Sequence, residues 1–346
     1  MMKIVPRKKV SEILKVVTLP PVDRYYSTGC TLLDLAIADR LPGGFAAGRI
    51  SHIFGPESSS KSILVAEPLG SAQRQGGLSY LVDTEATFDF GRAKLFGVDE
   101  KKLVYKSNDQ ANGLSIEQLF DSIIVGAETD IAQLGKNGHG AMGIDSLSAL
   151  PSEVELEESL TASTYGTSRP LALSKGFRKH LSGITNANLA LLFVDQTRQN
   201  ITGFGKKNVF SGGEALKFYA STRIYVEKKA NILNKFKKII GIEVYFRVDK
   251  NKIAPPFRDG EFTILFDYGI DDIQSNLKWL KMYKPEYDKK SSWIQVPGLE
   301  KKYQSMALAV QAIESEGNEL IALLRWEVET LWDTVYEKVD RKARVR

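Results

Sequence analysis

A run of small residues closed by a lysine and a serine most constrains what this chain can fold into. It reads Gly-Pro-Glu-Ser-Ser-Ser-Lys-Ser and occupies residues 55–62. A strand-like run at residues 49–54 precedes it, and a helix-like run at residues 63–75 follows it. A strand, a small-residue loop and a helix in this order predict a phosphate-binding loop, in which main-chain N–H groups and the helix N-terminus face the phosphates.

The residue types in the loop suggest separate roles. Lys61 is expected to reach the β- and γ-phosphates of ATP, and the Ser62 hydroxyl is expected to bind Mg²⁺. Ser60 stands where the usual pattern has glycine, and a side chain at a position with positive φ costs about 1–2 kcal/mol. The residues predicted to surround the nucleotide here are Gly55, Pro56, Glu57, Ser58, Ser59, Ser60, Lys61, Ser62 and Ile63.

Composition narrows the class of protein. With 346 residues, 43% hydrophobic and 26% charged, the chain predicts one large core and one or two smaller parts. No run of about 18 apolar residues and no apolar signal segment occur, so we expect a cytoplasmic protein without a membrane span. The single cysteine, Cys30, permits no internal disulfide, and three histidines argue against structural zinc. A net charge of +5 is compatible with nucleic acid binding without indicating it.

Three strand-like runs end in polar side chains that suit nucleotide chemistry. Residues 78–85 end at Glu85, either the group that activates the attacking water or a solvated loop acid. Residues 140–146 contain Asp145, which is expected to order Mg²⁺ through water. Gln196 follows the run at residues 189–194, either as a sensor of the γ-phosphate or as an ordinary strand-end residue.

The order of the runs predicts the fold class and three parts of the chain. Alternating strands and helices indicate an α/β fold with a mostly parallel, twisted sheet, and three later runs, at residues 222–226, 239–248 and 261–266, look antiparallel. We predict a helix and linker at residues 1–25, an ATPase core at 26–269 and an α-rich domain with a basic tail at 270–346. The N-terminal helix is too small to bury its own apolar face, so it docks on its own core or on a neighbouring subunit.

Several short strings, taken together, resemble the RecA recombinase family. The match runs in register from about residue 25 to residue 270. Its strings are Ser27-Thr28-Gly29, Leu41-Pro42-Gly43-Gly44, Gly48-Arg49-Ile50, the phosphate loop, Gln73-Arg74, Glu85 with Asp89, residues 145–150, residues 212–221 and residues 250–257. The resemblance implies a RecA-like P-loop core around the phosphate loop.

The resemblance also implies an activity. It indicates a DNA-dependent ATPase that forms helical filaments on single-stranded DNA, pairs it with a homologous duplex and exchanges strands in recombination and repair. ATP would lie between subunits, and Lys250 and Lys252 would reach it from the next subunit; taken alone, this lysine pair is a surface turn. The N-terminal helix would dock on the adjacent subunit. Asp89 and Arg92 match nucleotide contacts, and Arg92, in place of an adenine-stacking tyrosine, would stack by its guanidinium plane or not at all.

Two loops would face DNA, one between Glu153 and Pro170 and one between Arg198 and Gly212. Arginines supply charge-assisted bonds to phosphate, and glycines let the main chain approach it closely. The predicted DNA contacts are Ser174, Arg178, Arg198, Gly212 and Gly213 by position in the family, Arg169 as a substitute for a missing loop arginine, and Phe204 as an aromatic addition.

Departures from the family pattern leave alternatives open. Ser60 favours a phage- or plasmid-borne member, Asp195 stands where bacterial members usually have asparagine, and a basic end replaces the usual acidic tail. One alternative is a ring-forming motor with the same core, either a helicase or a branch-migration ATPase. The other is a DNA-binding mediator that does not hydrolyse ATP.

Overall fold

The computed structural model describes residues 22–107, 114–157, 168–199, 208–210, 213–284, 287 and 291–337. Its centre is a ten-stranded sheet in the order β12-β11-β10-β9-β3-β7-β6-β4-β5, with β8 paired to β7. The strands of this sheet are β3 (Ile50–Gly55), β4 (Leu78–Asp83), β5 (Leu103–Ser107), β6 (Gly140–Asp145), β7 (Leu189–Gln199), β8 (Asn208–Phe210), β9 (Thr222–Leu233), β10 (Ile239–Asn251), β11 (Asp259–Leu265) and β12 (Gly269–Asp271).

The strands from β9 to β5 pair in parallel, whereas β10, β11 and β12 join antiparallel at the other end. The predicted α/β fold with a mainly parallel sheet is therefore confirmed. Buried apolar runs such as Leu189–Val194 explain the parallel part, because strands covered on both faces carry apolar side chains at every position. Two short two-stranded sheets add β1 (Tyr25–Tyr26) with β2 (Phe45–Ala46) and β13 (Ile294–Gln295) with β14 (Lys302–Tyr303).

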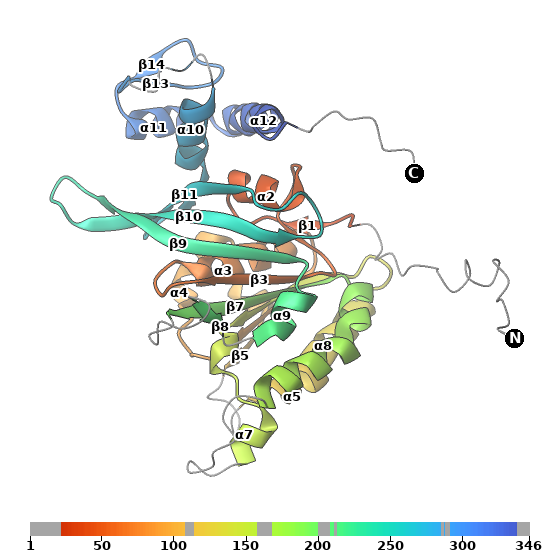
Figure 1. Ribbon diagram of the computed structural model, residues 1–346. Helices are drawn as coiled ribbons and strands as arrows, with labels where there is room; N and C mark the ends of the chain where they lie inside the picture. Colours follow the sequence, from red (N-terminus) through yellow and green to blue (C-terminus); the bar gives the residue numbers. More distant parts are fainter. Residues whose placement is uncertain are drawn as a thin grey trace, which may run out of the picture.

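Helices cover the sheet and gather at its ends (Figure 1). Helices α10 to α12 lie beside β11, and α7 and α8 lie at the opposite end of the molecule. The longer helices are α2 (Thr31–Ala38), α3 (Lys61–Arg74), α6 (Val125–Gln133), α8 (Ser168–Asn186), α9 (Gly213–Tyr219), α10 (Asp272–Tyr283), α11 (Met306–Glu316) and α12 (Asn318–Val335). Shorter turns are α4 (Phe90–Ala93), α5 (Ile116–Gln118), α7 (Glu153–Glu157), 3₁₀ turns at Lys94–Phe96, Glu100–Lys102 and Leu147–Ala149, and a π-helical turn at Leu119–Ile124.

Some sequence expectations about elements need correction. The first predicted DNA loop is shorter than residues 153–170, because α7 takes residues 153–157 and α8 begins at Ser168. The predicted strand at residues 222–226 is longer than expected, since β9 runs from Thr222 to Leu233. Helix α10 was not predicted, because its buried face includes the polar side chains of Asp272, Ser275 and Asn276, which weaken the apolar periodicity. The predicted N-terminal helix lies outside the described residues, as does most of the basic tail.

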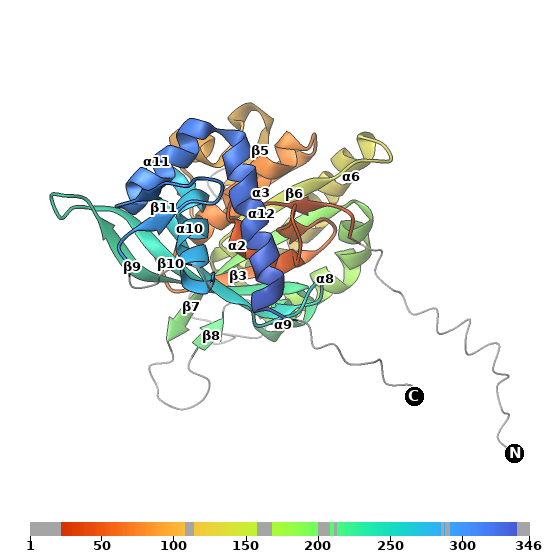
Figure 2. The same cartoon turned by 90° about the horizontal axis from the view of Figure 1, so that it is seen from above.

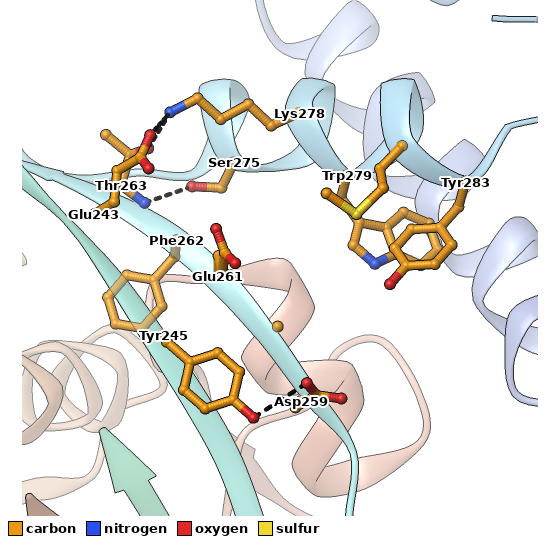
Figure 3. Close-up of a pocket in the computed structure, with 12 residues that line it drawn as sticks. Glu243, Tyr245, Asp259, Glu261, Phe262, Thr263, Ser275, Lys278, Trp279 and Tyr283 are labelled. Atoms are coloured by element: carbon orange, nitrogen blue, oxygen red, sulfur yellow. Dashed lines mark hydrogen bonds and ion pairs between the residues drawn. The ribbon is translucent and has the colours of Figure 1, made fainter. Parts of the chain in front are cut away.

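Helix α10 packs between the antiparallel end of the sheet and helix α12, and it is bonded to strands β11 and β10 (Figure 3). The main-chain N–H of Thr263 on β11 donates to Ser275 Oγ at 3.0 Å, and Lys278 Nζ pairs with Glu243 Oε1 at 2.5 Å. Behind these contacts the Trp279 and Trp332 rings lie 5.7 Å apart and both are buried. The apolar core therefore continues from the sheet into α12.

Strands β9 and β10 form a long hairpin that projects beyond the body of the molecule, as both overall views show (Figures 1 and 2). Pairing runs from Ile239 opposite Leu233 to Asn251 opposite Thr222. The side chains of Leu233 and Phe236, near the hairpin end, are 53% and 70% exposed. Apolar side chains that stay this exposed mark the hairpin as a surface available for contact.

Candidate functional site

The phosphate loop joins β3 to α3 and contains two residues in the left-handed region. Ser58 has φ 56° and Ser60 has φ 62°, so Ser60 adopts the positive φ expected at the glycine position of the pattern. Gly55 is constrained differently, because a Cβ there would lie 1.9 Å from the carbonyl oxygen of Val226. The loop thus tolerates a side chain at residue 60 at a cost in strain, and tolerates none at residue 55.

Lys61 opens helix α3 and is turned back into the loop. Its Nζ donates to the carbonyl oxygens of Pro56 at 2.6 Å and Gly55 at 3.2 Å, and to Ser59 Oγ at 3.3 Å. Burial lowers the pKa of Lys61, and nearby carboxylates, Asp145 first among them, offset this shift. The loop thus holds a buried cation at the N-terminus of a helix, the arrangement that anion binding requires.

Ser62 and Asp145 meet at the end of β6. Ser62 Oγ donates to Asp145 Oδ2 at 2.5 Å, and burial raises the pKa of Asp145. A hydroxyl and a carboxylate are hard oxygen ligands that suit Mg²⁺. Among the described residues no group of three or more His, Cys, Asp or Glu side chains could hold a metal.

Glu85 lies just beyond the end of β4, near the end of β6 and beside Gln196, which lies within β7 because that strand continues to Gln199. Ser146 Oγ donates to Glu85 Oε1 at 2.8 Å, and Gln196 Nε2 lies 3.5 Å from the same oxygen. The Thr84 hydroxyl holds this segment against Ser146 through two hydrogen bonds of 2.8 Å. The structure therefore brings Glu85 and Gln196 together, and it adds Ser146, which the sequence reading did not single out as a partner of Glu85.

A cavity of about 500 Å³ contains these groups. Its walls include the predicted residues Glu57 to Ser62, Glu85, Asp145 and Gln196. One wall was not predicted: it consists of Lys228, Asn231, Ile239 and Ile242 from the hairpin, together with Phe266. Nothing in the sequence pointed to these residues, because only the sheet order places the hairpin beside the phosphate loop.

Asp89 and Arg92 lie next to this cavity rather than in it. With Ile63 they line an adjoining cavity of about 140 Å³ that also touches Ser62 and Asp145. Arg92 Nη2 donates to the carbonyl oxygen of Phe266 at 2.7 Å, so its guanidinium is bonded to the main chain of the opposite wall.

In the part of the chain that the structure describes, neither Lys250 nor Lys252 lines either of these two cavities. Lys250 Nζ donates to the carbonyl oxygens of Lys217 at 2.6 Å and Phe218 at 3.0 Å, at the C-terminal end of α9. Partial burial, with the nearby charges of Lys252 and Arg223, lowers the pKa of Lys250 to about 8. Lys250 is thus bonded to the end of α9 rather than to the phosphate loop.

The predicted DNA contacts fall partly on α8. Arg178 is exposed and Ser174 is half-buried. Arg169 donates through Nη2 to the carbonyl oxygens of Leu147 at 3.0 Å and Ser148 at 2.9 Å, so much of its bonding capacity is used within the chain. Arg198 is the next-to-last residue of β7 and Gly213 begins α9, whereas Phe204 and Gly212 lie outside the described residues.

Comparison with known proteins adds independent information. The family model of the RecA N-terminal domain matches residues 18–271. Protein RecA of Synechocystis sp. is 35% identical over 245 residues, which cover 70% of this chain and 64% of the relative. Protein RecA of Wolbachia sp. is 34% identical over 248 residues, or 71% and 65% of the two chains. Protein RecA of Caulobacter sp. is 34% identical over 268 residues, or 77% and 70%. The match thus spans less than two thirds of the first two relatives. No helix in the described part of the chain is both long and apolar enough to cross a membrane.

Proposed function

Because this chain belongs to the RecA family, we propose that it is a DNA-dependent ATPase that forms helical filaments on single-stranded DNA and catalyses homologous pairing and strand exchange. The observation that carries this proposal is the convergence of Lys61, the Ser62–Asp145 pair and the Glu85–Gln196 pair on one cavity. We place the protein in the cytoplasm, where it would act on DNA.

The residues around the cavity support a division of roles in hydrolysis. Glu85 takes a proton from the water that attacks the γ-phosphorus, while the bond to the bridging oxygen of ADP breaks and leaves ADP and inorganic phosphate. Lys61 and the α3 N-terminus stabilise the charge on the phosphates. Ser62 and Asp145 would hold Mg²⁺, which supplies further positive charge to the phosphate oxygens.

The position of Lys250 and Lys252 supports an ATP site shared between subunits. Neither lysine lines the cavity beside the phosphate loop of its own chain, and Lys250 is bonded to the end of α9, which suits a role toward nucleotide held by a neighbouring copy. We propose that residues 1–25 dock on that neighbour and that residues 270–346 form a separate small domain. Arg178 and the loops near residues 153–170 and 198–212 would face the DNA.

A strand-exchange assay with and without ATP tests the proposal. The wild-type protein should exchange a single strand into a homologous duplex only with ATP, and Lys61→Ala should not. Lack of exchange by the wild-type protein would contradict strand-exchange activity. Closed rings in electron microscopy with ATP and single-stranded DNA would favour the ring-forming motor instead. Strand binding without DNA-stimulated ATP turnover would favour the mediator.

A further inference from the structure

The loop that carries Glu85 is anchored at its base by a buried carboxylate. Asp83, the last residue of β4, is 3% exposed. Its Oδ1 accepts from the main-chain N–H of Glu85 at 3.2 Å. Its Oδ2 accepts from the main-chain N–H of Phe88 at 2.7 Å and from the Tyr105 hydroxyl at 3.0 Å. These bonds hold the main chain of the loop but do not involve the Glu85 side chain, which is exposed and lines the cavity.

Two serine hydroxyl groups hold the Glu85 side chain itself. Ser146 Oγ donates to Glu85 Oε1 at 2.8 Å, and Ser148 Oγ lies 2.6 Å from Ser146 Oγ. A hydroxyl has one proton to donate, and an ionised carboxylate can only accept. The proton of Ser146 therefore lies toward Glu85, and Ser148 must be the donor in its bond with Ser146. The result is a hydroxyl chain with one direction, from Ser148 to Ser146 to Glu85.

The main chain that presents the two hydroxyl groups is also held in place. Ser146 is 0% exposed, and both its N–H and its carbonyl oxygen bond to the Thr84 hydroxyl at 2.8 Å. The carbonyl oxygens of Leu147 and Ser148 accept from Arg169 Nη2 at 3.0 Å and 2.9 Å. Supporting hydrogen bonds of this kind keep a reacting group within its productive geometry. The hydroxyl chain is therefore preorganised by its surroundings.

The contacts distinguish the two carboxylate oxygens of Glu85. Among the described residues, the donors to this carboxylate all lie at Oε1: Ser146 Oγ at 2.8 Å and, more weakly, Gln196 Nε2 at 3.5 Å. A carboxylate oxygen has two lone pairs, so both of those on Oε1 face a donor. An oxygen that already accepts hydrogen bonds is a poorer proton acceptor, which leaves Oε2 as the atom that can take a proton from water.

We propose that Ser146 and Ser148 are positioning residues for ATP hydrolysis, which hold Glu85 by Oε1 so that Oε2 faces the attacking water. This inference rests on the proposed ATPase function and adds two residues to that same site. In this role neither serine contacts the reacting atoms, and each acts through Glu85. Ser146 orients the carboxylate directly, whereas Ser148 acts through Ser146, so loss of the first hydroxyl should have the larger effect.

The test measures ATP turnover by the whole chain with saturating single-stranded DNA. Ser146→Ala should lower kcat about 10- to 100-fold, and Ser148→Ala about 3- to 10-fold, because a hydrogen bond to a charged group is stronger than one between two hydroxyl groups. The KM for ATP should stay within about twofold in both variants, since the serines do not bind the nucleotide. Ser148→Thr keeps the hydroxyl group and should keep kcat near the wild-type value.

The sharpest measurement is made in the Glu85→Gln background. Glutamine cannot accept the proton, so a serine that acts only through Glu85 has nothing further to affect. Glu85→Gln combined with Ser148→Ala should therefore hydrolyse ATP within about twofold of the rate of Glu85→Gln alone, whereas independent effects would multiply. A general defect of the fold would instead lower the rate in both backgrounds.

Ser275→Ala is the matched control. Ser275 on α10 is 2% exposed, accepts from the Thr263 N–H at 3.0 Å and donates to the Asp271 carbonyl oxygen at 2.6 Å, but it does not line the cavity that contains Glu85. This variant should keep the wild-type kcat. Thermal unfolding of every variant checks the fold, and Ser148→Ala, at a half-buried position, decides the question if Ser146→Ala does not fold.

The possible failures separate the two proposals. A normal kcat in folded Ser148→Ala, a loss that Ser148→Thr does not restore, or effects that multiply with Glu85→Gln would each overturn the inference. Absence of ATP turnover by the wild-type protein, or full turnover by Glu85→Gln, would instead overturn the proposed catalytic function on which the inference rests.

Discussion

The proposed ATP site has two sides, one formed by the phosphate loop with Glu85 and the other by Lys250 and Lys252. They differ in how many of their contacts are already made within one subunit. On the first side Lys61, Ser62 and Glu85 all have partners in the same chain and surround one cavity. On the second side Lys250 caps α9, and Lys252 is exposed. The first side is therefore preorganised by the sheet, whereas under the proposed function the second would take part only when another subunit is added. Substitutions on the two sides should fail in different ways.

The largest effect is expected from Glu85→Gln. The amide keeps the shape of the side chain and can still bond to Ser146, but it cannot accept a proton from water. ATP turnover should fall about 100- to 10,000-fold, while ATP-dependent filaments should persist in electron microscopy. Unchanged turnover would remove Glu85 from the role of proton acceptor and leave it as a solvated loop acid.

Lys61→Ala should cause the second-largest loss of ATP turnover. It removes the buried cation from the loop, so ATP turnover with single-stranded DNA should fall about 100- to 1,000-fold. Calorimetric titration should also show weaker ATP binding, unlike in the Glu85 variant. Normal ATP binding together with normal turnover would show that the cavity is not the phosphate site.

Lys250→Gln probes the other side of the comparison. Glutamine keeps a hydrogen-bond donor for the α9 carbonyl groups but loses the charge, so ATP-dependent assembly should weaken about tenfold. DNA binding without nucleotide should change less than twofold, because the proposed partner of this charge is the phosphate of a neighbour's ATP rather than DNA. Light scattering against protein concentration measures assembly. An equal loss of DNA binding would mean that Lys250 contacts DNA directly.

The pH dependence of assembly follows from the same lysine. Its pKa is lowered to about 8, so the cation is present below that pH and is lost as pH rises through it. Binding a phosphate favours the charged form, so ATP-dependent assembly should weaken as pH rises above about 8. Lys250→Arg, which stays charged, should remove this decline in the same scattering assay. A decline that persists in the arginine variant would assign the titration to another group.

Ser60→Gly should have the smallest effect of these substitutions, and it should stabilise the protein rather than impair it. Glycine relieves about 1–2 kcal/mol of backbone strain at φ 62° in the folded state. It also lowers the stability by about 0.4–1 kcal/mol, because it gives the unfolded chain more conformational entropy. The free energy of unfolding should rise by about 1 kcal/mol, measured by denaturant titration. Ser59→Gly is the control, because Ser59 has a negative φ and bonds to the Pro56 carbonyl, so its loss should destabilise the protein.

The sequence predicted the parts of the site that depend on local pattern. Apolar runs that end in acids placed Glu85 and Asp145 at strand ends, and the loop before a helix placed Lys61 and Ser62. Contacts that depend on the order of strands in the sheet could not be predicted from the sequence. Strand β3 lies between β7 and β9, which are far from it in the chain, so neither the hairpin wall nor the pairing of His52 with Arg223 could be foreseen. Helix α10 was missed because its buried face is partly polar.

The two unusual positions of the phosphate loop affect how relatives of this chain can be found. A search pattern that demands glycine directly before the lysine rejects this loop, although Ser60 takes up the required geometry. The position that excludes every side chain is Gly55, five residues earlier, where the main chain of β9 leaves no room for a methyl group. Motif definitions that are strict at the first glycine and permissive at the last would retain such divergent members, and variant libraries for this loop should be diversified by the same rule.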